Sequence, residues 1–131
     1  MTNYEIIQVI NKLDSMAGQS YPFQMARAIA KTVKTLRAEY DIYKESYDDM
    51  LKKYYELDDE GHVRIDENGN DVLKDETLRE EAVNAIRDLL NEKVENITIT
   101  QFDESVLESV DKISSADYTF FDEYLIKPKE D

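Results

Sequence analysis

The sequence lacks several of the residue types on which catalytic and structural sites usually depend. Among 131 residues there are no cysteines, no tryptophans, one histidine and three glycines. Disulfides, thiolate zinc sites and a cysteine nucleophile are therefore excluded, and one chain cannot assemble a multi-histidine zinc site. The glycines lie too far apart for a phosphate-binding loop or a dinucleotide-binding turn. We predict a protein that is not an enzyme and needs no cofactor.

Long apolar runs and a targeting segment are also missing. No run reaches 18 apolar residues, so a membrane span is not expected. The segment Met1–Glu5 has neither the basic nor the apolar part of a signal peptide. Together with the absence of cysteine, this favours the reducing cytoplasm as the location of the protein.

Basic residues are scarce and unevenly distributed. The chain holds 30 acidic and 16 basic residues, which gives a formal net charge of −14. Residues 1–38 carry a net charge of +3, whereas residues 39–131 carry −17. Such an acidic surface repels nucleic acid and favours basic protein surfaces. It can serve only to keep a small protein dispersed, or it can compete with nucleic acid for a basic groove on a partner.

Apolar spacing predicts a mainly helical chain built on one long helix. Thr2 and Glu5 form the capping-box pattern that opens a first helix near residue 3. From about residue 22 to about residue 57, apolar residues recur at alternating spacings of four and three. Such a seam needs a partner helix, which can be the first helix, a later helix or a second copy in a homodimer. The candidate self-association seam comprises Ile29, Val33, Leu36, Tyr40 and Tyr43, and its pattern continues through Tyr47, Met50 and Tyr54.

Turn residues and β-branched residues predict extended segments after the long helix. Asn68-Gly69 is a tight-turn dipeptide that favours a β-hairpin, and the strict alternation from Glu95 to Thr100 favours a strand paired with it. The predicted fold class is α+β, mainly α: a long helical hairpin with a small antiparallel β-sheet and short C-terminal helices. The single predicted domain, 1–131, comprises a long helix at about 22–57, a β-hairpin at about 62–73, a helix at about 76–93, a strand at about 95–100 and short helices at about 103–125.

Two charged clusters are candidate partner-binding sites. Four cations follow one another on the long helix at spacings of four, three and three, which keep the first three on one face and displace the fourth slightly. No acid lies between Asp14 and Glu39. The cations can hold phosphates of a nucleotide or nucleic acid, or they can pair with acidic helices of this chain or of a second copy. The second cluster lies in the acidic loop, where residues 56–67 also match a calcium-binding loop imperfectly. The candidates are Arg27, Lys31, Lys34 and Arg37 in the first cluster, and Asp58, Asp59, Glu60, Asp66 and Glu67 in the second.

The order of these features resembles a known family. The segment Tyr21–Lys31 opens a long helix that is first basic and then acidic, and glycine-containing acidic turns follow at 59–61 and 66–69. A helix end at 89–94 and the segment 113–117 complete the pattern. This arrangement resembles an uncharacterised family of small acidic proteins encoded by phages and prophages of Gram-positive bacteria. The resemblance implies a phage origin and the cytoplasm of the bacterial host, and it brings no assigned activity.

Three functions fit these observations. The first is a non-enzymatic phage or prophage accessory protein whose acidic surface binds a host protein, for example as a nucleic-acid mimic that inhibits a defence system such as a CRISPR nuclease. The second is a virion assembly or morphogenesis factor that acts through helical self-association. The third is a nucleotide- or nucleic-acid-binding module that uses the basic face of the long helix. We favour the first, with a host or phage protein as partner, and we do not expect direct nucleic-acid binding.

Overall fold

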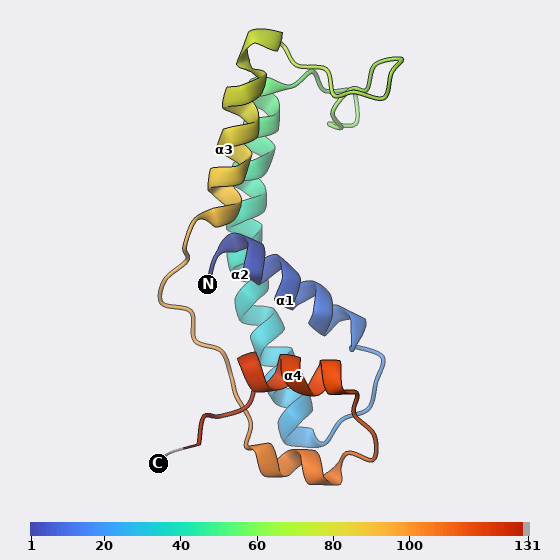
Figure 1. Ribbon diagram of the computed structural model, residues 1–131, viewed down its shortest axis with the longest axis vertical. Coiled ribbons are helices and arrows are strands. Elements are labelled where there is room, and N and C mark those ends of the chain that lie inside the picture. The colour runs from blue at the N-terminus through green and yellow to red at the C-terminus, as the bar shows by residue number, and fades with distance from the viewer. Residues whose placement is uncertain (130–131) are drawn as a thin grey trace.

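The chain is organised around one long helix, α2, which spans Phe23–Tyr54. The computed structural model describes residues 1–129 (Figure 1). No glycine or proline interrupts α2, so its backbone hydrogen bonds run unbroken along its length. The helix ends where Tyr55 takes an extended backbone conformation and leads into a loop that projects from the helices.

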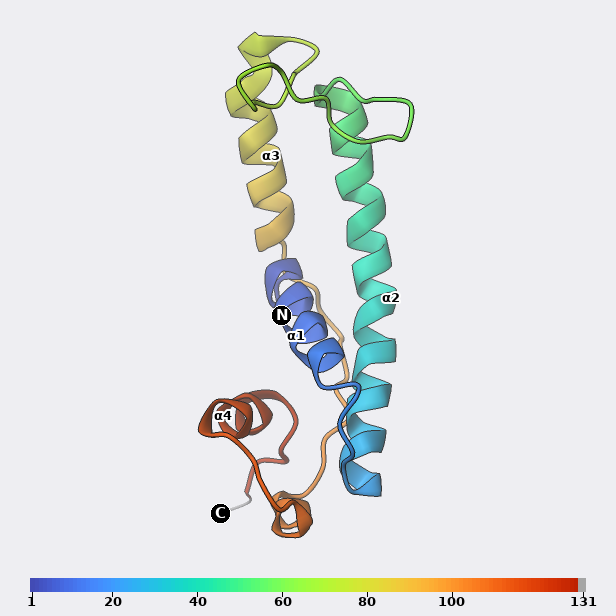
Figure 2. The same ribbon diagram turned by 90° about the vertical axis from the view of Figure 1, so that its right-hand side faces the viewer.

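Two shorter helices lie end to end beside α2 (Figure 2). Helix α1 spans Asn3–Ser15 and begins with the capping box formed by Thr2 and Glu5. Helix α3 spans Arg79–Asn91 and follows η1, a short 3₁₀ helix at Glu76–Leu78. Helix α1 covers the N-terminal part of α2 and α3 covers the C-terminal part. Helix α3 runs antiparallel to α2, whereas α1 crosses α2 obliquely (Figure 1).

Hydrogen bonds join the start of α1 to the end of α3. The backbone N–H of Asn3 donates to the carbonyl oxygen of Glu92 at 3.1 Å, and Asn3 Nδ2 donates to that of Leu89 at 2.9 Å. The N–H of Val94 donates to the carbonyl oxygen of Met1 at 2.8 Å. The last carbonyl groups of a helix lack the usual partners within it, and here the start of α1 donates to two carbonyl groups at the end of α3.

The C-terminal segments close the lower part of the molecule. Two short helices, η2 at Glu104–Ser109 and α4 at Ser115–Tyr124, follow an extended stretch that runs back along α2 (Figure 1). Phe121 of α4 is fully buried and makes edge contacts with the rings of Tyr21 and Phe102. This part of the chain therefore belongs to the same core as α1 and the first half of α2.

The apolar seam of α2 is covered within the chain. Leu36 is fully buried, and Ile29, Val33 and Tyr40 pack against the same core as α1 and α4. Tyr43 is 9% exposed, and its ring lies 5.9 Å from the ring of Tyr47. The seam therefore serves the core of the protein, and it offers no apolar surface from which a homodimer could be argued.

The predicted antiparallel β-sheet is wrong, because residues 1–129 contain no β-strand. Residues 62–73 do fold back on themselves, but their backbone makes only isolated bridges, Ile65 with Asp71 and Leu57 with Val63. A third bridge joins Tyr55 to Leu73. Three extended segments meet at one point here and do not run side by side, so no ladder develops.

The predicted strand at 95–100 is also absent. The alternation of apolar and polar residues does correspond to packing, since Ile97 and Ile99 both contact the main core. Asn96, however, has a φ of +63°, which interrupts the extended backbone, and residues 95–100 form no bridge with another segment. The carbonyl oxygen of Thr100 instead accepts a hydrogen bond from Thr32 Oγ1 of α2 at 3.2 Å. In the part of the chain that the structure describes, no helix is both long enough and apolar enough to cross a bilayer.

Candidate functional site

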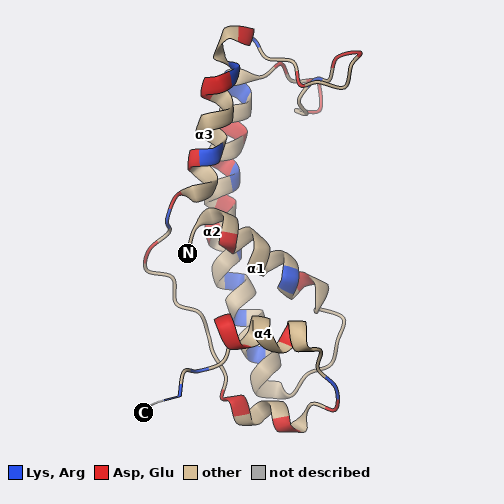
Figure 3. Ribbon diagram, viewed as in Figure 1, with Lys and Arg blue, Asp and Glu red and all other residues tan. Residues whose placement is uncertain are grey.

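The two predicted charged clusters lie at opposite ends of α2. Arg27 and Lys34 lie on its first half, whereas Asp58 and Glu67 lie in the loop that follows its last residue (Figure 3). With a rise of about 1.5 Å per residue, Arg27 and Tyr54 are about 40 Å apart along the helix. The structure therefore does not bring the clusters together, and we treat them as separate sites.

The acidic loop is an ordered pair of turns, which we call the double turn and define as residues 55–74. The Asp58 Oδ1 atom accepts hydrogen bonds from the N–H groups of Glu60 and His62, both at 2.9 Å. Asp66 Oδ1 repeats this arrangement with the N–H groups of Asn68 at 2.8 Å and Asn70 at 2.9 Å. The N–H groups of His62 and Glu60 hold the pKa of Asp58 below its ordinary value, so its carboxylate stays ionised at neutral pH.

A closed ring of backbone hydrogen bonds holds the double turn together. Glu56 N–H donates to the Val72 carbonyl oxygen at 2.9 Å, and Val72 N–H donates to the Arg64 carbonyl oxygen at 2.9 Å. Arg64 N–H donates to the Glu56 carbonyl oxygen at 2.8 Å, which completes the ring. The three residues are evenly spaced, eight positions apart. The three isolated bridges surround this ring with the same approximate threefold symmetry.

Sequence reasoning interpreted these residues as a single hairpin and missed the ring. The signal that reveals it is a repeat of eight residues, in which Leu57-Asp58 precedes Gly61 and Ile65-Asp66 precedes Gly69. Both glycines have positive φ angles, +84° and +80°, as the two turns require.

The double turn is anchored on one side and exposed on the other. Tyr55 and Leu73 pack with Tyr54 and Ala82 in a second small core between α2 and α3. Ile65, in contrast, is 57% exposed beside the exposed carboxylates that follow it. This surface combines negative charge, which complements a basic surface, with one exposed apolar side chain.

A calcium site in residues 56–67 finds no support in the geometry. No three acidic or histidine side chains within residues 1–129 converge closely enough to hold a metal ion. One oxygen of Asp58 is already occupied by two backbone N–H groups. His62 is exposed, and its Nδ1 lies 3.6 Å from a carboxylate oxygen of Glu60.

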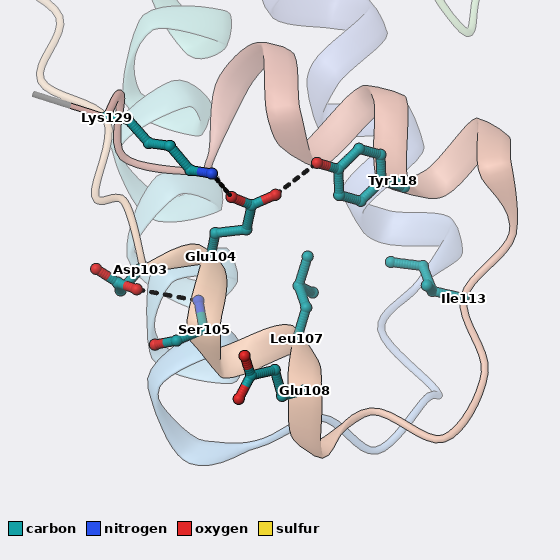
Figure 4. Close-up of a pocket in the computed structure, with 8 residues that line it drawn as sticks. All are labelled: Asp103, Glu104, Ser105, Leu107, Glu108, Ile113, Tyr118 and Lys129. Carbon is teal, nitrogen blue, oxygen red and sulfur yellow. Dashed lines mark hydrogen bonds and ion pairs between the residues drawn. The ribbon is translucent and has the colours of Figure 1, made fainter. Parts of the chain in front are cut away.

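An open groove lies between η2 and α4 (Figure 4). It has a volume of about 600 Å³ and includes the exposed Ile113. Glu104 in its wall accepts a hydrogen bond from the hydroxyl of Tyr118 at 2.6 Å and pairs with Lys129 Nζ at 3.2 Å. The Tyr118 hydroxyl and Lys129 lower the pKa of Glu104, and the carboxylate raises the pKa of Tyr118. Because Glu104 is ionised and already bonded to Tyr118 and Lys129, we interpret it as a residue that holds these segments together and not as a general acid.

The predicted basic cluster is divided by one ion pair. Arg37 donates to both carboxylate oxygens of Asp14 at 2.7 Å, which ties α2 to α1. Arg27, Lys31 and Lys34 are exposed and take part in no ion pair within residues 1–129. The cluster thus retains three free cations on one helix face.

Comparison of the chain with protein-family models, with curated proteins and with solved structures finds no match. The candidate sites therefore rest on their own geometry and charge.

Proposed function

We propose that this chain is a non-enzymatic phage accessory protein that binds a basic surface of a host protein through its double turn. The observation that carries the proposal is the concentration of charge on a projecting, ordered segment. Residues 56–71 contain seven acidic residues and a single arginine, and the segment stands away from the helices (Figures 1 and 3). A partner can reach these carboxylates without disturbing the core.

The order of the double turn favours binding. Loops that must be ordered on association lose conformational entropy, and a preformed loop avoids much of that loss. The backbone ring through Glu56, Arg64 and Val72 and the two aspartate-capped turns hold this segment in one conformation. Asp59 and Glu67 are exposed and form no ion pair within the described residues, so their carboxylates are available to a partner.

The chemistry of the partner follows from this surface. Its carboxylates can pair with lysine and arginine side chains of a partner. The exposed Ile65 can pack against an apolar side chain that lies between those cations. A groove that normally holds nucleic-acid phosphates supplies such cations. We therefore infer a nucleic-acid-mimicking inhibitor, acting in the cytoplasm of the bacterial host on a nucleic-acid-handling enzyme such as a CRISPR nuclease.

The alternative functions have less support. The virion-assembly hypothesis relies on the apolar seam of α2 as the self-association surface, and α1 and α3 already cover that seam. A nucleic-acid-binding module would use Arg27, Lys31 and Lys34, but these three cations act within a chain whose net charge is −14. Long-range repulsion of phosphates therefore opposes that function.

Capture from a host lysate tests the proposal. Tagged protein is incubated with lysate of a Gram-positive host at about 50 mM and about 500 mM salt, and retained proteins are identified by mass spectrometry. We expect a basic, nucleic-acid-handling protein that is retained at low salt, lost at high salt and displaced by short duplex DNA. Recovery of phage structural proteins alone, independent of salt, would support assembly instead.

A further inference from the structure

One face of α2 points away from every other helix, and we call it the outer face. The residues buried on α2, among them Met25, Ala28 and Leu36, lie on the opposite side, toward α1 and α4. In Figure 2 no other segment covers the outer side of α2 along its lower half. All members of the outer face are exposed and recur at heptad-like spacing: Arg27, Lys31, Lys34, Ala38, Asp41, Ile42, Glu45 and Asp49.

The charges on the outer face are arranged symmetrically about Ala38. Lys31 and Glu45 each lie seven positions from Ala38, and Arg27 and Asp49 each lie eleven positions from it. Between Arg27 and Asp49, every cation of the face precedes Ala38 and every acid follows it; the exposed Lys52 continues the spacing beyond Asp49. If the face is laid on an inverted copy of itself, Lys31 therefore meets Glu45 and Arg27 meets Asp49, while Lys34 meets Ile42.

One chain cannot use this complementarity by itself. Lys31 and Glu45 are fourteen positions apart on a continuous helix, which is about 21 Å along the axis. Salt bridges within a helix form only between residues three or four positions apart. Neither residue has an ion-pair partner among residues 1–129. A second copy can supply both partners at once.

We propose that the outer face of α2 binds the outer face of a second copy, with the two helices antiparallel and a twofold axis at Ala38. The same surface is used on both copies, which is the usual arrangement in a dimer of identical chains. Lys31 of each copy lies opposite Glu45 of the other, and Arg27 lies opposite Asp49. This contact is distinct from the apolar seam, and it does not rest on the proposed function.

Apolar groups at the centre of the outer face suit close contact. Ala38 is small and exposed, so it lets two helix backbones approach. Ile42, which is 61% exposed, lies opposite Lys34 of the other copy, whose methylene groups can cover it while its ammonium group reaches Asp41. Burial of this isoleucine adds an apolar contribution to the ion pairs around it.

A cysteine introduced at the twofold axis tests the geometry directly, since the natural chain has none. Packed helices with axes about 8–10 Å apart place facing Cα atoms about 3.5–5.5 Å apart, which overlaps the disulfide range. Ala38→Cys should therefore form a disulfide-linked dimer under mild oxidation. Ala30→Cys is the matched control, because Ala30 is exposed on the same helix and lies about 24 Å from its copy in this arrangement.

Charge reversal tests the pairing and separates it from net charge. By sedimentation velocity at a fixed salt concentration, Lys31→Glu and Glu45→Lys should each raise the dimer Kd by about tenfold or more, because each creates two like-charge contacts. The double variant Lys31→Glu/Glu45→Lys keeps the natural net charge and should return the Kd to near the natural value. If only overall repulsion mattered, Glu45→Lys would strengthen association, because it makes the chain less negative.

Several results would overturn the proposal. A natural chain that remains monomeric up to about 1 mM would do so, and so would equal cross-linking of the two cysteine variants. Stronger association of Glu45→Lys, or a double variant weaker than either single variant, would also contradict it. All substituted residues are exposed, and unchanged helical circular dichroism verifies that each variant is folded.

Discussion

Asn3 and Thr32 are the two polar side chains that the structure buries among the described residues, and each donates to a carbonyl group far along the chain. Asn3 is the more consequential, because its bond to Leu89 joins two helices end to end. No buried side-chain nitrogen or oxygen within residues 1–129 lacks a partner. Polar contacts of this kind are hard to foresee, because nothing in the local pattern around Asn3 distinguishes it from an exposed asparagine.

Replacement of Asn3 tests the joint between α1 and α3. Asn3→Ala removes one buried donor, while the Glu92 N–H still donates to the Leu89 carbonyl oxygen at 3.3 Å, so the free energy of unfolding should fall by about 0.5–1.5 kcal/mol. Asn11→Ala, at an exposed position of α1, should change it by less than about 0.5 kcal/mol. Urea unfolding measures the free energy of unfolding of both variants. Equal losses would show that the hydrogen bond between Asn3 and Leu89 does not stabilise the fold.

The tie at Glu104 makes a prediction about pH. Tyr118 and Lys129 lower the pKa of Glu104 in the folded chain, so the ionised carboxylate stabilises the fold. That stabilisation is complete above the ordinary glutamate pKa and is lost as the pH falls through the lowered one. Tyr118→Phe removes the larger cause, and the pKa of Glu104 should rise toward its ordinary value in a carboxyl NMR titration. Tyr4→Phe is the control, and a similar rise in that variant would contradict the assignment.

At the scale of elements, helices were easier to predict than the contacts between them. The capping box at Thr2 and Glu5 marks α1 in the sequence, and a proline at the helix start followed by uninterrupted spacing of apolar residues marks α2. The partner of the seam could not be decided, because α1, α3 and a second copy all satisfy the same pattern. The extended segments at 62–73 and 95–100 have strand-like residues, but whether they form a sheet depends on which segments the tertiary fold places beside them.

The double turn could be recognised only in part. Asn68-Gly69 indicates one tight turn, and the structure contains a turn there. The closed ring depends on the equal length of two consecutive turns, which a search for one hairpin does not consider. Its acidic residues were candidates from charge alone, whereas the exposure of Ile65 follows from the ring, which leaves its side chain outside the small core.

A pair of glycine substitutions tests the ring. Gly69 has a φ of +80°, where a side chain costs about 1–2 kcal/mol even though nothing crowds the position. Gly69→Ala should therefore open the ring more often and speed hydrogen exchange of the Val72 amide by about 5–30-fold. Gly18 has equal space and no positive φ, so Gly18→Ala should leave this exchange rate unchanged. An unchanged exchange rate of the Val72 amide in Gly69→Ala would contradict the proposed dependence of the ring on this glycine.

At the scale of the whole molecule, most large apolar side chains pack inside the chain and the charged surface faces outward. Cations gather on the first half of α2, and acids gather on the double turn, α3 and the C-terminal helices (Figure 3). The net charge of −14 therefore does not describe the surface charge well, because the basic face and the acidic faces attract partners of opposite charge. We expect contacts with other molecules to be polar, sensitive to salt and specific to one face.

The central claim is that the double turn binds a basic partner because of where its charge lies. The most direct test repeats the lysate capture with Asp59→Lys/Glu60→Lys/Glu67→Lys and with a control, Glu108→Lys/Asp122→Lys/Glu123→Lys, which has the same net charge and alters exposed residues of η2 and α4. We predict that the first variant loses the partner and that the control retains it. Equal loss from both would mean that net charge alone drives capture, and retention by the first variant would place the binding surface elsewhere.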